Sequence, residues 1–215
     1  MGETGRMIAA PWSAALLAAA LAVLPLSGPG RAGGADSQAG EARAPGGGRL
    51  LLVAGDPSRS LAGFTARDRS GRKVAFASGE EGHPLTVVSF FATCCCVHCK
   101  RELRELRTLE ESFPSLRVLL VSLDAAMTPA VASFVEEAGL RAPLVHDDAG
   151  SVYAAFGMEQ LPQTYVLDRR GRILIDGRRF GEGAEVPSWT SPQVAALLRR
   201  AERGEPLGLP GAPRD

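Results

Sequence analysis

The chain has 215 residues, of which 45% are hydrophobic, and its 24 basic and 24 acidic side chains give a formal net charge of zero. This size and composition are those of one globular domain with additional segments, so disorder throughout the chain is excluded. The balanced charge and the scarcity of Trp and Tyr argue against a nucleic acid or an anionic membrane surface as partner.

The first 35 residues resemble a targeting segment in their order of basic, apolar and small regions. Arg6 precedes the uncharged, Ala- and Leu-rich stretch 7–26, and small residues follow as far as Ala35. The favoured interpretations are a cleaved signal peptide and an N-terminal membrane anchor, since the stretch is just long enough to span a bilayer. Both predict a periplasmic or otherwise extracytoplasmic protein, secreted or membrane-anchored, in a compartment where disulfides persist.

Two further segments are predicted to lack regular structure. The Gly-, Ala- and polar-rich composition of residues 32–48 predicts a flexible linker, which we assign to residues 36–55. The Gly- and Pro-rich residues 206–215 are expected to form a disordered tail. The folded domain is therefore expected to cover residues 56–205.

Within this domain, short apolar strands alternate with amphipathic helices. The expected strands are Ala62–Arg67, Lys73–Ala77, Leu85–Phe91, Leu116–Leu123, Pro143–His146, Thr164–Asp168 and Arg172–Asp176. The expected helices are Cys99–Ser112, 129–138, Ser151–Phe156 and 191–203. This order predicts an α/β fold with a central mixed β-sheet flanked by helices and an N-terminal β-hairpin extension.

All four cysteines lie in one cluster, at Cys94, Cys95, Cys96 and Cys99. No distant cysteine remains to form a structural disulfide framework, so redox chemistry and metal binding are the two interpretations. The Cys-x-x-Cys formed by Cys96 and Cys99 stands where a predicted strand gives way to a helix, whose free N–H groups favour a thiolate. Cys99 can then attack a mixed disulfide at Cys96 and release the partner.

Four further positions, three of them in or beside the cysteine motif, leave alternatives open. His98 can stabilise the thiolate and make the disulfide more oxidising, or it can simply be exposed at a helix start. Cys94 and Cys95 are packing residues, or else a second exchange partner or added metal ligands. Pro162 precedes a predicted strand, where an X–Pro bond can be cis, although an ordinary proline is the expectation from this residue alone.

Two separated motifs resemble the TlpA/ResA-like branch of the thioredoxin superfamily. The first comprises Phe-Phe-Ala-Thr at 90–93, the Cys-x-x-Cys and Lys-Arg-Glu-Leu at 100–103. The second, within 153–173, has a Gly, then Pro-x-Thr at 162–164, then a strand ending Asp-x-x-Gly-x-Ile. The resemblance covers residues 60–203.

The resemblance implies a thioredoxin-like fold, a cis proline at Pro162 facing Cys96 and Cys99, and thiol-disulfide exchange with exported proteins. Val97 and His98 occupy the dipeptide that tunes the redox potential in this superfamily. Members often act in cytochrome c maturation and receive electrons from a membrane partner. No cofactor and no metal is implied.

The chain departs from the family pattern before and within the predicted helix. Cys94 and Cys95 stand where the family has one residue, usually Trp, so Cys95 could instead be the nucleophile, with His98 in the resolving position. Cys96 is preferred because it keeps the segment after Cys99 in family register. Arg104 replaces a common Pro.

A proton-transferring carboxylate is not evident in the sequence. Ser89 occupies the strand position at which cytosolic thioredoxins carry a buried Asp that assists proton transfer. Glu102 is the nearest candidate to replace it, and a solvated position on the helix is the expectation for this residue.

Two competing functions use the same residues. A peroxiredoxin-like peroxidase has Thr-x-x-Cys, which Thr93 and Cys96 match, but the upstream Pro of that family is missing. A copper or other metal chaperone would use the thiol cluster and His98, which suit Cu(I). The remaining histidines, His83 and His146, do not lie beside Pro162 in the sequence.

Overall fold

The computed structural model describes residues 50–56, 59, 61, 63–79, 82–94, 97–179 and 184–210, and the structural statements below concern these residues. The predicted targeting segment 1–35, the linker as far as residue 49, Cys95, Cys96 and residues 211–215 lie outside them. None of the described helices is long and apolar enough to cross a membrane.

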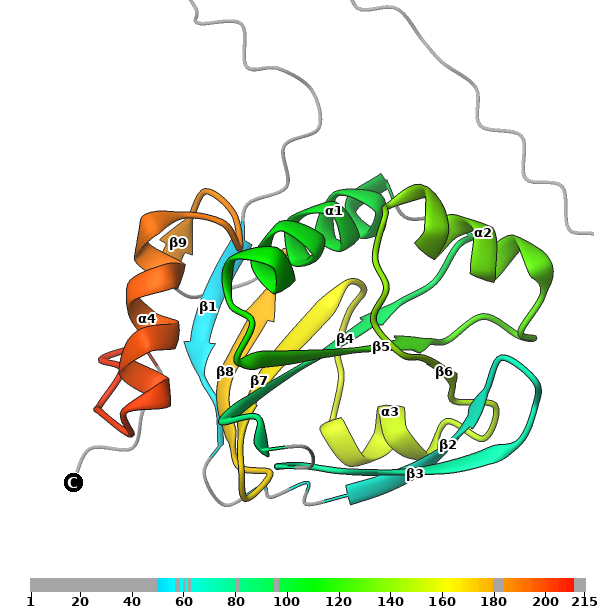
Figure 1. Cartoon of the computed structure of the whole chain (residues 1–215), viewed down its shortest axis with the longest axis horizontal. Helices are drawn as coiled ribbons and strands as arrows, with labels where there is room; N and C mark the ends of the chain where they lie inside the picture. The colour runs from blue at the N-terminus through cyan, green and yellow to red at the C-terminus, as the bar shows by residue number, and fades with distance from the viewer. Residues whose placement is uncertain are drawn as a thin grey trace, which may run out of the picture. The chain divides into compact units, whose positions relative to one another are not determined.

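Nine strands in the described part of the chain form one mixed sheet. In chain order they are β1 (Leu50–Ala54), β2 (Gly63–Asp68), β3 (Lys73–Ala77), β4 (Leu85–Phe91), β5 (Leu116–Ser122), β6 (Leu144–His146), β7 (Gln163–Asp168), β8 (Ile173–Arg178) and β9 (Ala184–Val186). Their order across the sheet is β3-β2-β6-β5-β4-β7-β8-β1-β9 (Figure 1). The central strands β4, β5 and β6 are parallel, and β7 is antiparallel to β4.

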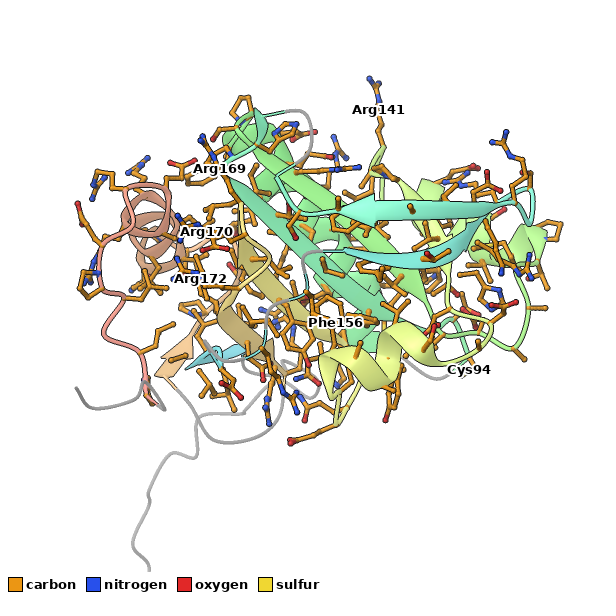
Figure 2. All side chains as sticks on the ribbon, turned by 90° about the horizontal axis from the view of Figure 1, so that it is seen from below. Cys94, Arg141, Phe156, Arg169, Arg170 and Arg172 are labelled. Atoms are coloured by element: carbon orange, nitrogen blue, oxygen red, sulfur yellow. The ribbon has the colours of Figure 1, made fainter. Side chains whose placement is uncertain are left out.

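Helices cover both faces of this sheet (Figure 1). They are α1 (Val97–Ser112), α2 (Pro129–Glu137), α3 (Ser151–Phe156) and α4 (Pro192–Glu202). Side chains of α1, α2 and α4 share one apolar cluster with one face of the sheet, while α3 and the β2–β3 hairpin share a second cluster with the other face. Figure 2 shows Phe156 between α3 and the sheet.

The central position of β4 follows from its continuous apolar sequence. All seven residues are buried, with Val87 and Phe91 in the first cluster and Val88 and Phe90 in the second. A strand buried on both faces carries apolar side chains on both, which is why a period-2 alternation is absent; Thr86 and Ser89 are its two polar residues. The α/β architecture and the N-terminal hairpin are thus as the sequence predicts.

The prediction of a flexible linker as far as residue 55 is wrong from Leu50 onward. Leu50 and Leu52 are fully buried, and β1 pairs with β8 on one side and β9 on the other. The five apolar residues of β1 come directly after a Gly-rich stretch, and the composition of that stretch obscured the short strand. The sequence analysis also missed β9.

The prediction of a disordered tail from residue 206 is wrong for residues 206–210. Leu209 is buried, Leu207 packs against the first cluster, and the Ala54 N–H donates to the Pro210 carbonyl over 2.8 Å. Two leucines in an otherwise Gly- and Pro-rich sequence are enough to bind this segment to β1. The chain segments before and after the predicted domain therefore meet.

Replacing Leu52 with Ala is expected to lower the free energy of unfolding by about 2–5 kcal/mol, because it leaves a cavity beneath β1. Val53, which is half-buried on the opposite face of the same strand, gives the control. Val53→Ala should cost clearly less in the same urea titration followed by circular dichroism. A negligible effect of Leu52→Ala would show that β1 does not belong to the cooperative fold.

Candidate functional site

The cysteine motif lies where β4 gives way to α1. Cys94 is exposed on the connecting loop and lies at the surface (Figure 2), whereas Cys99 in the first turn of α1 is fully buried. Val97 and His98 are the first two residues of α1, and His98 is half-buried. The described structure therefore places the predicted resolving thiol inside the domain, in the first turn of α1.

Asp124 anchors the loop that leads into the motif. Its carboxylate accepts hydrogen bonds from the Thr93 backbone N–H over 3.0 Å, from Thr93 Oγ1 over 2.6 Å and from Ser122 Oγ over 2.8 Å. Asp124 follows the carboxyl end of β5, so one side chain ties the ends of β4 and β5 together. Thr93, three residues before Cys96, is thereby fixed in position.

His146 reaches the same anchor from the end of β6. Its Nε2 lies 2.6 Å from the Asp124 carbonyl oxygen, and because a carbonyl only accepts, Nε2 must carry the hydrogen. The sequence analysis considered His146 only as a distant metal ligand, whereas the parallel pairing of β5 and β6 brings it near the loop. Among the described residues, no group of three or more His, Cys, Asp or Glu is arranged to hold a metal ion.

Pro162 lies at the same edge of the sheet. The Leu161–Pro162 peptide bond is cis, as the family resemblance implied. Gln163 pairs with Phe90, which sets Pro162 beside the end of β4 where the cysteine segment begins. Cys99 and Pro162, which are 63 positions apart in the sequence, therefore lie at the same edge of the sheet.

Glu102 is buried, with 1% of its surface exposed, and the expectation of a solvated position is wrong. Its Oε1 accepts from Thr164 Oγ1 over 2.6 Å and from Trp189 Nε1 over 2.5 Å. Its Oε2 accepts from Arg179 Nε over 2.8 Å and contacts Arg179 Nη2 at 2.6 Å. Segments distant in the sequence cover this face of α1, which local periodicity could not reveal.

Ser89 is connected to this carboxylate through Thr164. The two hydroxyl oxygens lie 2.8 Å apart, and since Thr164 donates its hydrogen to Glu102, Ser89 must donate to Thr164. The strand position at which cytosolic thioredoxins carry Asp thus holds a hydroxyl. A carboxylate reaches the same region from the helix instead.

Burial raises the pKa of the Glu102 carboxyl, and the positive charge of Arg179 and the hydrogen bonds from Thr164 and Trp189 offset that rise only in part. Glu102 follows Cys99 by three positions in α1, so the two side chains lie on one helix face, with Cβ atoms about 5–6 Å apart. A buried carboxyl with a raised pKa beside a buried thiol is suited to accept a proton and return it.

Sequence analysis did not identify Asp124, Arg179 or Trp189. No local pattern marks them, since each acts on a residue at least 31 positions away. Thr164 was noted only as part of the second motif. The hydrogen bonds show one buried network, which consists of Ser89, Glu102, Thr164, Arg179 and Trp189.

Comparison with known proteins supports this assignment of the fold. A family model described as AhpC/TSA family matches residues 57–174. The thiol-disulfide oxidoreductase ResA of Bacillus thuringiensis subsp. konkukian is 26% identical over 125 residues, which are 57% of this chain and 70% of that protein.

Two solved structures extend the comparison. A thiol:disulfide interchange protein DsbE of Chlorobium tepidum gives a TM-score of 0.51 at 18% identity, covering 72% of this chain and 98% of the other. A secreted Mycobacterium tuberculosis disulfide oxidoreductase gives a TM-score of 0.50 at 22% identity, covering 62% and 96%. The thioredoxin-like fold and the resemblance to ResA-like proteins are confirmed.

Replacing Asp124 with Ala should lower the free energy of unfolding by about 1–3 kcal/mol, because the part-buried Thr93 N–H loses its acceptor. The Thr93 amide should also exchange its hydrogen faster. Asp124→Asn is the matched control, since its carbonyl oxygen still accepts from Thr93. Equal effects of both variants in urea unfolding and hydrogen exchange would contradict the anchoring role.

Proposed function

Since the chain belongs to the AhpC/TSA family, we propose that it is an extracytoplasmic thiol-disulfide oxidoreductase acting through Cys96 and Cys99. The observation that carries this proposal is the buried Glu102 carboxylate, one helical turn from the buried thiol of Cys99. A purely structural helix has no use for that pairing, whereas a resolving thiol needs a proton acceptor.

In the reducing direction, the Cys96 thiolate attacks a substrate disulfide, and one substrate sulfur leaves and takes a proton from water. The Cys99 thiol then passes its proton to Glu102 and attacks the Cys96 sulfur. A Cys96–Cys99 bond forms, the mixed disulfide breaks, and the second substrate thiolate receives the proton from Glu102. Two electrons pass from the dithiol to the substrate, and the reverse sequence oxidises a substrate dithiol.

The supporting residues have separate proposed roles. Val97 and His98 lie between the two cysteines, where His98 would stabilise the Cys96 thiolate and make the disulfide more oxidising. Pro162, which follows a cis peptide bond, is proposed to face the cysteine pair, as the family resemblance implies. Cys94 is exposed and could enter exchange reactions of its own, as could Cys95.

The proposed substrates are disulfides or dithiols of exported proteins. The signal- or anchor-like segment 1–35 supports an extracytoplasmic site of action. The TlpA/ResA-like resemblance supports a membrane electron donor that restores the dithiol, with cytochrome c maturation as the setting. No cofactor takes part in the proposed reaction.

A peroxidase is less well supported. The Thr93 hydroxyl matches the Thr of Thr-x-x-Cys, but it donates its one hydrogen to Asp124 Oδ1. It therefore has no hydrogen left to donate to a peroxide bound at Cys96. A metal chaperone using the thiol cluster remains the alternative from another functional class.

The cysteine assignment predicts three distinct phenotypes with a disulfide-bonded test peptide. Cys96→Ser should abolish exchange, Cys99→Ser should accumulate a mixed disulfide at Cys96, and Cys94→Ser should retain exchange. Equilibration with glutathione followed by mass spectrometry identifies the pairs formed. If Cys95→Ser abolishes exchange and Cys96→Ser does not, the alternative register is correct. Thiols that purify saturated with copper would favour the metal chaperone.

Replacing Glu102 with Gln should slow resolution of the mixed disulfide about a hundredfold or more, because the proton acceptor is lost. The rise of the rate with pH that follows ionisation of Glu102 should also disappear, since Gln does not titrate, and only the rise due to ionisation of the Cys99 thiol should remain. Stopped-flow measurement of partner release over a range of pH provides the test. Glu111→Gln changes an exposed glutamate at the other end of α1 and should leave the rate and its pH dependence unaltered.

A further inference from the structure

Arg179, just after β8, is a fully buried arginine that contacts two glutamates of α1. Its Nη2 lies 2.6 Å from Glu102 Oε2 and 2.7 Å from Glu105 Oε2, and its own side chain has no exposed surface. The two acceptors are three positions apart on one helix face. One guanidinium therefore spans the turn of α1 that follows Cys99.

Trp189 completes the enclosure from the segment before α4. Its indole Nε1 donates to Glu102 Oε1 over 2.5 Å, and its backbone N–H donates to Glu105 Oε2 over 3.0 Å. The indole lies against Gly177 of β8, where a Cβ would come within 2.4 Å of the ring. Glycine at this position thus leaves the space that the tryptophan occupies.

The fold alone gives little reason for this buried ion pair. Burial costs each charge its hydration, and well-packed apolar side chains of similar volume often serve stability as well or better. Glu102 of this pair lies on α1, three positions after Cys99. It accepts a hydrogen bond from Thr164 on β7, the strand that follows Pro162. Its position indicates a role in the chemistry of Cys99.

We propose that Arg179 and Trp189 are positioning residues of the redox site, which hold the Glu102 carboxylate ionised and in one orientation beside Cys99. This inference rests on the proposed function. Burial by itself would keep Glu102 protonated, and a protonated carboxyl cannot accept the Cys99 proton. The guanidinium supplies the countercharge that makes the carboxylate available.

The hydrogen bonds also select the oxygen that receives the proton. Oε2 is held by two guanidinium N–H groups, whereas Oε1 accepts from the neutral Thr164 hydroxyl and the Trp189 indole. Losing a neutral donor costs less than losing a charged one, so the proton enters at Oε1. The Thr164 hydroxyl can then turn and accept the hydrogen, and the indole environment changes with it.

The described charged or titratable groups near Glu102 come from two elements. They are Cys99, Arg101 and Glu105 on α1 and Arg179 after β8. The residues that face Glu102 from β4 and β7, Ser89 and Thr164, are neutral. Replacing Arg179 with a neutral residue is therefore the substitution that alters the charge beside Glu102 most directly.

The test reads Glu102 through the fluorescence of Trp189 in the full chain. The chain has two tryptophans, so Trp12→Phe leaves Trp189 as the sole emitter. In the dithiol form, emission should show a pH transition that Glu102→Gln abolishes. Arg179→Met should move its midpoint upward by more than one pH unit, and Arg179→Lys, which keeps the charge, should move it less.

The rate of mixed-disulfide resolution provides the second measurement. Arg179→Met should lower this rate near neutral pH about tenfold for each unit that the midpoint rises. In the Glu102→Gln background the same change should have no further effect, because Arg179 acts through Glu102. Arg101→Met, which removes a neighbouring arginine that contacts Glu105, is the matched control and should leave the midpoint within half a unit.

Each outcome decides one question. A midpoint unmoved by Arg179→Met, or an equal loss of rate in the Glu102→Gln background, overturns the positioning role. If Arg179→Met does not fold, the midpoint of Arg179→Lys decides the matter. Trp189→Phe, which keeps an aromatic ring and removes the Nε1 donor, then serves in the rate measurement only, because it also removes the emitting tryptophan. A wild-type chain without Cys96–Cys99 exchange overturns the proposed function, whereas normal exchange with an unmoved midpoint overturns this inference alone.

Discussion

The buried carboxylate of Glu102 is the point at which four parts of the domain meet. Donors from β7, from the residue after β8 and from the segment before α4 all converge on one side chain of α1. An ionised group that loses its hydration needs hydrogen-bond donors and a countercharge in return. These donors therefore tie the three segments to α1. In the proposed reaction, the constraint that closes this side of the domain also supplies the proton acceptor for Cys99.

A second constraint acts at the carboxyl ends of the parallel strands β4, β5 and β6. Parallel neighbours end at one edge of the sheet, and polar side chains there lie within reach of one another. Asp124 uses this arrangement to fix Thr93, and His146 supports Asp124 from the next strand. Asp124 thus holds Thr93 ahead of the cysteine motif, while the Glu102 network holds the first turns of α1 that follow it.

The Glu102 network provides a route for the proposed proton transfer in a chain that has a serine at this strand position. A carboxylate carried by α1 moves with the helix that holds Cys99, so their separation is set within one element. The Ser89–Thr164 pair connects that carboxylate to β4 and β7 through neutral hydroxyls. Such hydroxyls can reverse their hydrogen bonds at little cost, whereas a second buried charge would need its own partner.

The sequence by itself determined the secondary structure of the domain apart from β1 and β9, because long apolar runs such as Leu85–Phe91 and a leucine stripe along α1 specify burial locally. It also identified the cysteine motif and the loop of Pro162, since both are local patterns. The tertiary structure decided the environment of Glu102, because its partners Arg179 and Trp189 stand 77 and 87 positions away. Helical periodicity reports which face is apolar, but only the fold determines which polar residues on the flank of that face lose contact with water.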